Sequence, residues 1–294
     1  MKLVRLGRLV VSGATIWAGM ERTRLVPIFT FFLPFAFVAL MAQEQPPATT
    51  AAAPVPAPVL ENKGKPIEVP YACSAEDMQW GGLGCTEDEP CAIFLELSAA
   101  QATENRIFIA GNLHSEAVTL YSVLLESDDG GHTWTEGYQR MRGAALDRVQ
   151  FVDANTGWIS GAQLFPIPQN PFLLVTTNGG KTWTERPVFN ESAEDRFGVV
   201  QQFSFADKES GSLIVDRAEA GAGQRYVLFE SRTGGESWNI LQESSKPLRL
   251  KQAPAPSEWR VRADGPTKSY HVEHRQGERW TSVAAFAVKL EPCK

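Results

Sequence analysis

Short runs of alternating hydrophobic and polar residues follow one another through most of the chain beyond about residue 90, and glycine-rich polar stretches separate them. The segment from 144 to 189 is the clearest, with runs at 148–152, 157–161, 172–176 and 183–188. Runs of this length with a period of two predict β-strands. Because the runs are short and closely spaced, the pattern predicts an all-β fold.

An eight-residue polar pattern ending in tryptophan occurs three times, at 127–134, 176–183 and 231–238. The Gly-Gly pair in each copy supplies the positive φ angles of a tight turn between antiparallel strands. Short polar side chains can bond to the backbone of the same turn, and the tryptophan begins the next strand. The residues assigned to these structural turns are Ser127, Asp129, Gly131, Thr133 and Trp134, then Thr176, Asn178, Gly180, Thr182 and Trp183, then Ser231, Gly235, Ser237 and Trp238; Thr233 replaces the aspartate in the third turn.

A second pattern precedes the turn: Phe151, Asp153, Gly157 and Trp158 are matched 54 residues later by Phe205, Asp207, Gly211 and Ser212. The two patterns form one repeating unit, and units of about 40 to 50 residues with several strands are typical of propeller blades. Four units are expected, at about 91–140, 144–189, 197–241 and 248–288. The last retains only Gly277 and Trp280 of the turn. The prediction is a β-propeller of four-stranded antiparallel blades, about four of them detectable.

The first turn resembles the Asp-box of bacterial neuraminidase repeats, S-x-D-x-G-x-T-W. Joined to the preceding pattern, the repeat resembles that of the photosystem II stability and assembly factor propellers and their non-photosynthetic bacterial relatives. The resemblance implies an exported, non-enzymatic propeller that holds partner proteins during assembly of membrane complexes. That family usually has seven blades. Four units leave three arrangements open, a closed ring, an open arc or pairing with a second copy, of which the closed ring is favoured.

The N-terminal region has a different composition. Residues 1–42 contain arginines before an apolar run from 25 to 42, which predicts a signal peptide or an uncleaved membrane anchor, with Met1 or Met20 as the start. Residues 43–68 are expected to form a Pro/Ala-rich linker, and 69–294 the propeller domain. The protein is therefore expected to be exported, periplasmic or extracellular.

The charge and the cysteine content limit the classes of function that the sequence allows. Residues 43–294 hold 23 basic and 33 acidic side chains, so binding to nucleic acid is not expected. Four cysteines in an exported chain suggest two disulfides. Complete pairing must join Cys293 to Cys73, Cys85 or Cys91 and so clasp the two ends of the repeats. The alternative is a local bond among the three, with Cys293 unpaired.

Candidate chemistry is sparse. Sialidases, in which Asp-boxes are common, use an arginine cluster, a tyrosine nucleophile with a glutamate, and an aspartic acid/base; no such set is recognisable. His271 and His274 are three apart on an expected strand and so point to opposite faces. No catalytic residue, metal or cofactor is predicted. Trp158 either packs between blades or belongs to an exposed binding face.

The leading hypothesis is a non-catalytic scaffold or assembly factor that binds an envelope or membrane protein. The alternative is a carbohydrate-binding or sialidase-like glycoside hydrolase protein. A hydrolase needs two carboxylates in one cleft. Binding loops are expected at 162–171 and 218–224.

Overall fold

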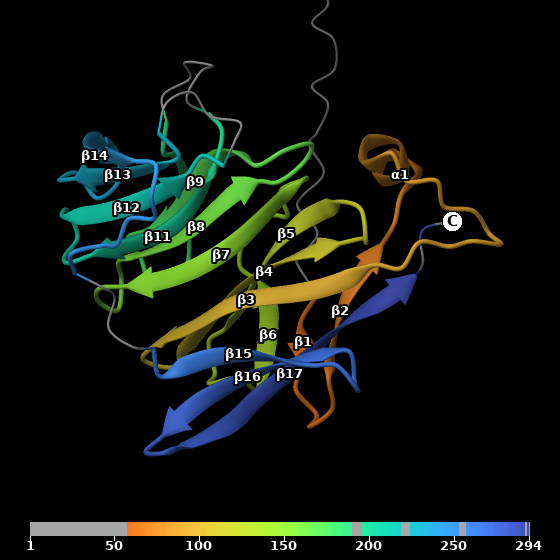
Figure 1. The fold of residues 1–294 in the computed structure, drawn as a ribbon. Helices are drawn as coiled ribbons and strands as arrows, with labels where there is room; N and C mark the ends of the chain where they lie inside the picture. Colours follow the sequence, from red (N-terminus) through yellow and green to blue (C-terminus); the bar gives the residue numbers. More distant parts are fainter. Residues whose placement is uncertain (1–57, 190–195, 219–223, 253–256, 292, 294) are drawn as a thin grey trace, which may run out of the picture. The chain divides into compact units, whose positions relative to one another are not determined.

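The computed structural model describes residues 58–189, 196–218, 224–252, 257–291 and 293 (Figure 1). Within these ranges the chain forms four sheets and one short helix, α1 (Ala75–Gly81). Sheet 1 has the strand order β1 (Leu60–Glu61), β6 (Thr133–Glu136), β5 (Thr119–Ser127), β4 (Arg106–His114), β3 (Phe94–Thr103). Sheet 2 has the order β10 (Thr184–Pro187), β9 (Gln169–Thr176), β8 (Gly157–Gln163), β7 (Ala144–Phe151), and sheet 3 the order β11 (Val199–Phe205), β12 (Gly211–Asp216), β13 (Tyr226–Ser231), β14 (Asn239–Ser244). Sheet 4 has the order β15 (Trp259–Asp264), β16 (Ser269–Gln276), β17 (Arg279–Glu291), β2 (Ile67–Ala72).

Consecutive strands pair antiparallel in sheets 1, 2 and 3, which is the meander of a propeller blade. The interior residues of β4 are all buried, because this middle strand is covered on both faces. The all-β class and the blade-like sheets predicted from the sequence are confirmed.

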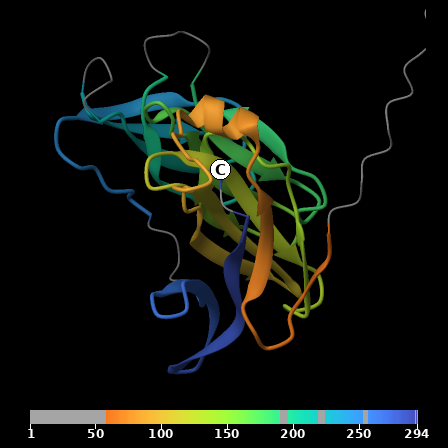
Figure 2. The same ribbon diagram turned by 90° about the vertical axis from the view of Figure 1, so that its right-hand side faces the viewer.

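Sheet 4 is completed from the other end of the chain. Strand β2 pairs parallel with β17, so that Ile67 lies beside Phe286 and Tyr71 beside Leu290. Figures 1 and 2 both show these two strands side by side. The N-terminal strand thereby supplies the fourth strand that the last repeat lacks.

The structure differs from two expectations, one about the linker and one about the last repeat. Strand β1 and the first residues of β2 lie inside the expected linker 43–68, so the folded domain begins before residue 69. Gly277 does occupy a turn, with φ of 63°, but this turn joins β16 to β17 and does not correspond to the repeat turns, which join the third and fourth strands of their sheets. The expected signal or anchor segment 1–42 lies outside the described residues.

Aromatic side chains fill the junctions between sheets. Trp134 packs edge-on against Phe286 between sheets 1 and 4, with ring centroids 5.0 Å apart. Phe108 stacks on Phe151 between sheets 1 and 2 at 4.8 Å. Trp158 stacks on Phe205 between sheets 2 and 3 at 3.8 Å, with the rings nearly parallel. Each such pair adds stabilisation of about 0.5–1.5 kcal/mol beyond the apolar area it buries.

These junctions join the sheets in the order 4, 1, 2, 3. Among the described strands, those of sheet 3 make no extended contact with those of sheet 4. The closed ring favoured by the sequence is therefore not formed by the residues that the structure describes. At the sheet 4 end, Arg260 and Arg262 hold Glu273, so this sheet carries charged side chains where an apolar face would be needed to pack another blade.

Both predicted disulfides are present. Cys73 bonds to Cys293 across 220 residues, and Cys85 bonds to Cys91 across six. The predicted bond between Cys293 and one of the three other cysteines is thus confirmed, and the alternative with Cys293 unpaired is wrong. The clasp fixes the end of β2 to the end of the chain and so closes sheet 4 rather than a ring of blades.

Candidate functional site

The three repeat turns, Ser127–Trp134, Thr176–Trp183 and Ser231–Trp238, share one hydrogen-bond network. In each, the first hydroxyl accepts the N–H of the second glycine, whose φ is positive. In each, the third side chain accepts the backbone N–H of the seventh residue. The first bond measures 2.8 Å from Gly131 to Ser127, 2.8 Å from Gly180 to Thr176 and 2.9 Å from Gly235 to Ser231. The second bond measures 2.9 Å from Thr133 to Asp129, 3.0 Å from Thr182 to Asn178 and 2.9 Å from Ser237 to Thr233.

This network explains why the third position tolerates Asp129, Asn178 and Thr233: each places one oxygen at the same point of the turn. At Asp129 the backbone N–H and hydroxyl of Thr133 bond to the carboxylate and hold its pKa well below the usual range. The aspartate is therefore satisfied within its own turn, which fits the structural role predicted for these residues.

The turns also dock onto the neighbouring sheet. The carbonyl of Gly234 accepts hydrogen bonds from Trp158 Nε1 at 2.9 Å and from Arg186 Nη1 at 3.0 Å, both on sheet 2. The carbonyl of Gly179 accepts one from Arg106 on sheet 1. Trp158 has no exposed surface. It belongs to the core between sheets, and the alternative of an exposed binding face is wrong.

Sheet 3 lacks this docking surface. Ser212 on β12 pairs with Glu230, as Trp158 on β8 pairs with Val175, so Ser212 stands where the docking tryptophan would be. The apolar part of the same face, around Ile214 and Leu228, is covered by Leu250 of the segment that follows β14. The row of blades therefore ends at sheet 3 with a small polar surface.

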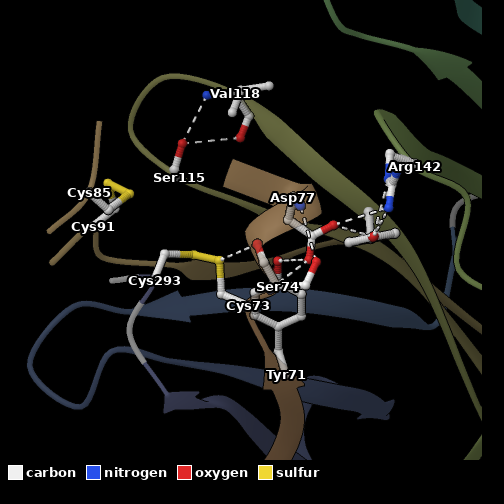
Figure 3. The surroundings of a disulfide bond; sticks show 11 residues. Tyr71, Cys73, Ser74, Asp77, Cys85, Cys91, Ser115, Val118, Arg142 and Cys293 are labelled. Carbon is white, nitrogen blue, oxygen red and sulfur yellow. Dashed lines mark hydrogen bonds and ion pairs between the residues drawn. A yellow bond between two sulfur atoms is a disulfide. The ribbon is translucent and has the colours of Figure 1, made fainter. Parts of the chain in front are cut away.

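A buried carboxylate lies beside the clasp (Figure 3). Asp77, 3% exposed, forms a capping box with Ser74 at the start of α1 and accepts hydrogen bonds from the hydroxyls of Tyr71 and Tyr121 and from Arg142. Burial alone would raise the pKa of Asp77, but these hydrogen bonds outweigh it and lower the pKa overall. The cluster borders a hollow of about 540 Å³. Because both oxygens of Asp77 are already bonded, the cluster serves to fix α1 on the blades.

A different kind of site lies on β3, β7 and β11, which we call the inner strands. Strands β3, β7 and β11 each contain a β-bulge, and in each the residue left without a partner is polar: Ser98, Asp147 and Gln201. The bulges occur at equivalent positions, since the neighbours of Ser98 and Asp147 pair around Gly111 and Gly161. A bulge re-aims a side chain, and bulges are common beside functional sites.

All three bulge residues line one cleft of about 380 Å³. Its other polar lining residues are Glu96, Asn112, Arg148 and Ser160. Ser160 is fully buried, and its hydroxyl has no hydrogen-bond partner; the side-chain oxygen of Gln201 is also buried without a partner. Buried polar atoms without partners are rare and costly, by about 1–3 kcal/mol each. Two such atoms therefore belong to residues that line this cleft.

The cleft is acidic. Asn112 donates to Glu96 at 3.3 Å, and Arg148 lies 3.5 Å from Asp147 while its Nε–H bonds to the carbonyl of Gln201. The packed surroundings raise the pKa of Asp147, Arg148 opposes this, and the nearby Glu96 carboxylate raises it further. The lining thus holds one arginine and two carboxylates.

Sequence reasoning missed this cleft, although a signal existed. Ser98 and Asp147 are 49 residues apart, like Trp134 and Trp183, and Asp147 and Gln201 are 54 apart, like Phe151 and Phe205. Aligning the repeats would have placed the three in one column. Of the expected binding loops, 162–171 contributes Ala162 and Leu164 to the cleft, while most of 218–224 lies outside the described residues.

The two histidines have separate partners. His271 lies 3.2 Å from the Ser282 hydroxyl, and His274 stacks on Trp259 at 4.5 Å. Trp259 packs against the core between sheets 1 and 4, whereas the ring of His271 lies 3.4 Å from the Asp264 carboxylate. The two side chains therefore point to opposite faces of β16, as expected from their spacing.

Fold and cleft together define a propeller-type repeat protein with an open polar cleft along its inner strands. No protein-family model matches the chain, and no curated protein matches its sequence. Among solved structures it is similar to a GH74 xyloglucanase from Xanthomonas campestris, with a TM-score of 0.36 and 18% identity, over 48% of this chain and 19% of that one. It is also similar to YCF48 from Cyanidioschyzon merolae, with a TM-score of 0.35 and 16% identity, over 66% of this chain and 57% of that one. The chain thus spans less than two thirds of either neighbour.

Proposed function

We propose that this protein is an exported, non-catalytic propeller-type scaffold that binds an envelope protein through the inner cleft. The observation that carries the proposal is the convergence of three bulge residues, Ser98, Asp147 and Gln201, with the unpartnered hydroxyl of Ser160 in one accessible hollow. The two disulfides support an oxidising compartment. Among the described residues, no helix is long and apolar enough to cross a membrane.

A non-catalytic role is supported by the surroundings of Ser160, whose buried hydroxyl lies at the cleft. A serine nucleophile needs a general base within hydrogen-bond distance. Ser160 has no hydrogen-bond partner, and it lies on a middle strand rather than on a flexible loop. Ser160 is therefore better suited to holding a group than to attacking one.

Site-specific photo-crosslinking in the native cell envelope tests the proposal. A photoreactive phenylalanine analogue at Ser98 is expected to capture one protein reproducibly, because Ser98 is exposed in the cleft. The matched control carries the analogue at Gln242, which is exposed on β14 and is not among the residues that line the cleft. Equal capture at both positions, or none at Ser98, contradicts the proposal.

The carbohydrate alternative is favoured by one observation: two carboxylates, Glu96 and Asp147, line the same cleft, and glycoside hydrolysis uses a pair of carboxylates in one cleft. Glycan-array binding and hydrolysis assays on the protein and on its Glu96→Gln and Asp147→Asn variants distinguish the two functions. Glycan binding or turnover that disappears in these variants would replace the scaffold proposal.

A further inference from the structure

We propose that the inner cleft recognises a primary alkylammonium group, supplied by a lysine side chain of the partner or by a free amine. This inference rests on the proposed function and names the chemistry of the same site. It starts from the hydrogen-bonding groups of the cleft, which are mostly acceptors. Glu96 and Asp147 are carboxylates, and the unpartnered atom of Gln201 is a carbonyl oxygen.

A ligand that completes these groups must bring donors. An ammonium group has three N–H donors and no acceptor, whereas a sugar hydroxyl brings one donor and two acceptor lone pairs. The unpartnered Ser160 hydroxyl can accept one of these bonds. An ammonium therefore matches the acceptor-rich lining better than a neutral polyol does.

The charge balance favours the same ligand. Arg148 is the cation among the residues that line the cleft, and with two carboxylates present it leaves one negative charge without a counterpart. The Glu96 carboxylate makes ionisation of Asp147 harder. A bound cation relieves this repulsion, because an opposite charge within a few ångströms favours the ionised form.

The walls suit the stem of such a ligand. Leu164, Val199 and Val200 border the cleft beside the polar groups. Lysine buries its methylene chain along apolar surface while its charged end makes polar contacts. A chain of about four methylenes thus meets the apolar wall, and its ammonium meets the carboxylates.

Saturation-transfer NMR on the full-length protein tests the recognition itself. The probes are n-butylammonium and Nα-acetyl-lysine methylamide, and n-butanol serves as the uncharged control. We expect signals from both cations and none from butanol, with binding weakened about three- to ten-fold by Glu96→Gln or by Asp147→Asn. The matched control is Glu278→Gln, in the exposed turn between β16 and β17. Equal binding of butanol, or no effect of both cleft variants, would overturn the inference.

Carbodiimide crosslinking in the cell envelope distinguishes the sources. This reagent joins a carboxylate to an adjacent amine as an amide, with loss of water. Mass spectrometry is expected to find Glu96 or Asp147 joined to a protein lysine. An adduct with a small amine would assign the free source. If no adduct of either kind is found, the inference is refuted. If photo-crosslinking from Ser98 still captures a protein, the scaffold proposal stands while the ammonium inference fails.

Discussion

The clasp Cys73–Cys293 offers a sharp test of how this fold is held together. It closes a loop of 220 residues, whereas Cys85–Cys91 closes one of six, so the chain contains its own matched control. The perturbation is replacement of each pair by alanine. In the native state, the pairing of β2 with β17 keeps the two ends together without the clasp, so its loss acts mainly on the unfolded chain.

The magnitude follows from loop closure. The chain-entropy relation gives about 5 kcal/mol for the long loop and about 2 kcal/mol for the short one. We therefore expect Cys73→Ala/Cys293→Ala to lower the free energy of unfolding by about 3 kcal/mol more than Cys85→Ala/Cys91→Ala does. Urea denaturation followed by tryptophan fluorescence measures both values. A clasp variant that loses no more stability than the short-loop variant would refute the reasoning.

Three further predictions concern the turns and junctions. Asp129→Asn should keep the stability at neutral pH, because Asn178 makes the same bond in the second turn, whereas Asp129→Ala should lose about 1 kcal/mol in urea unfolding. Since the pKa of Asp129 is lowered in the folded state, its contribution is full above about pH 4 and is lost as the pH falls further; acid unfolding of the Asn variant should lack this component. Trp158→Ala should cost about 3–5 kcal/mol and Trp158→Phe much less, and equal losses would contradict the stacking role. Ser212→Trp should restore an apolar docking surface and produce self-association in light scattering, whereas Ser212→Thr should stay monodisperse.

The strands of the second repeat were predictable because their alternation is local. The expected run 157–161 became β8 (Gly157–Gln163), and 172–176 became the end of β9 (Gln169–Thr176). The fourth strand of sheet 4 was not predictable in this way, since it comes from residues 67–72, and nothing in that segment marks β17 as its partner. The local sequence pattern predicts where a strand forms, but the pairing between distant segments depends on tertiary packing.

The repeat pattern in the sequence already indicates that the row of blades ends at sheet 3. Alignment of the second and third units placed Ser212 opposite Trp158, and this single exchange removes the ring that packs on the next blade and the N–H that bonds its turn. In repeat proteins the terminal unit carries a polar outer face. Ser212 thus marks the end of the row of blades.

The cleft also follows from the repetition of the blades, but here the repeated feature is a backbone position and not a side chain. Ser98, Asp147 and Gln201 occupy one bulge register, so the fold brings the three together whatever their chemistry is. The strand pairs on both sides of each bulge remain intact when the bulged side chain changes. The blades can therefore keep their turns and junctions constant while three positions set the ligand. For this chain, those positions combine with Glu96 to give an acidic, acceptor-rich cleft, which is the physical basis for expecting a cationic group of the partner there.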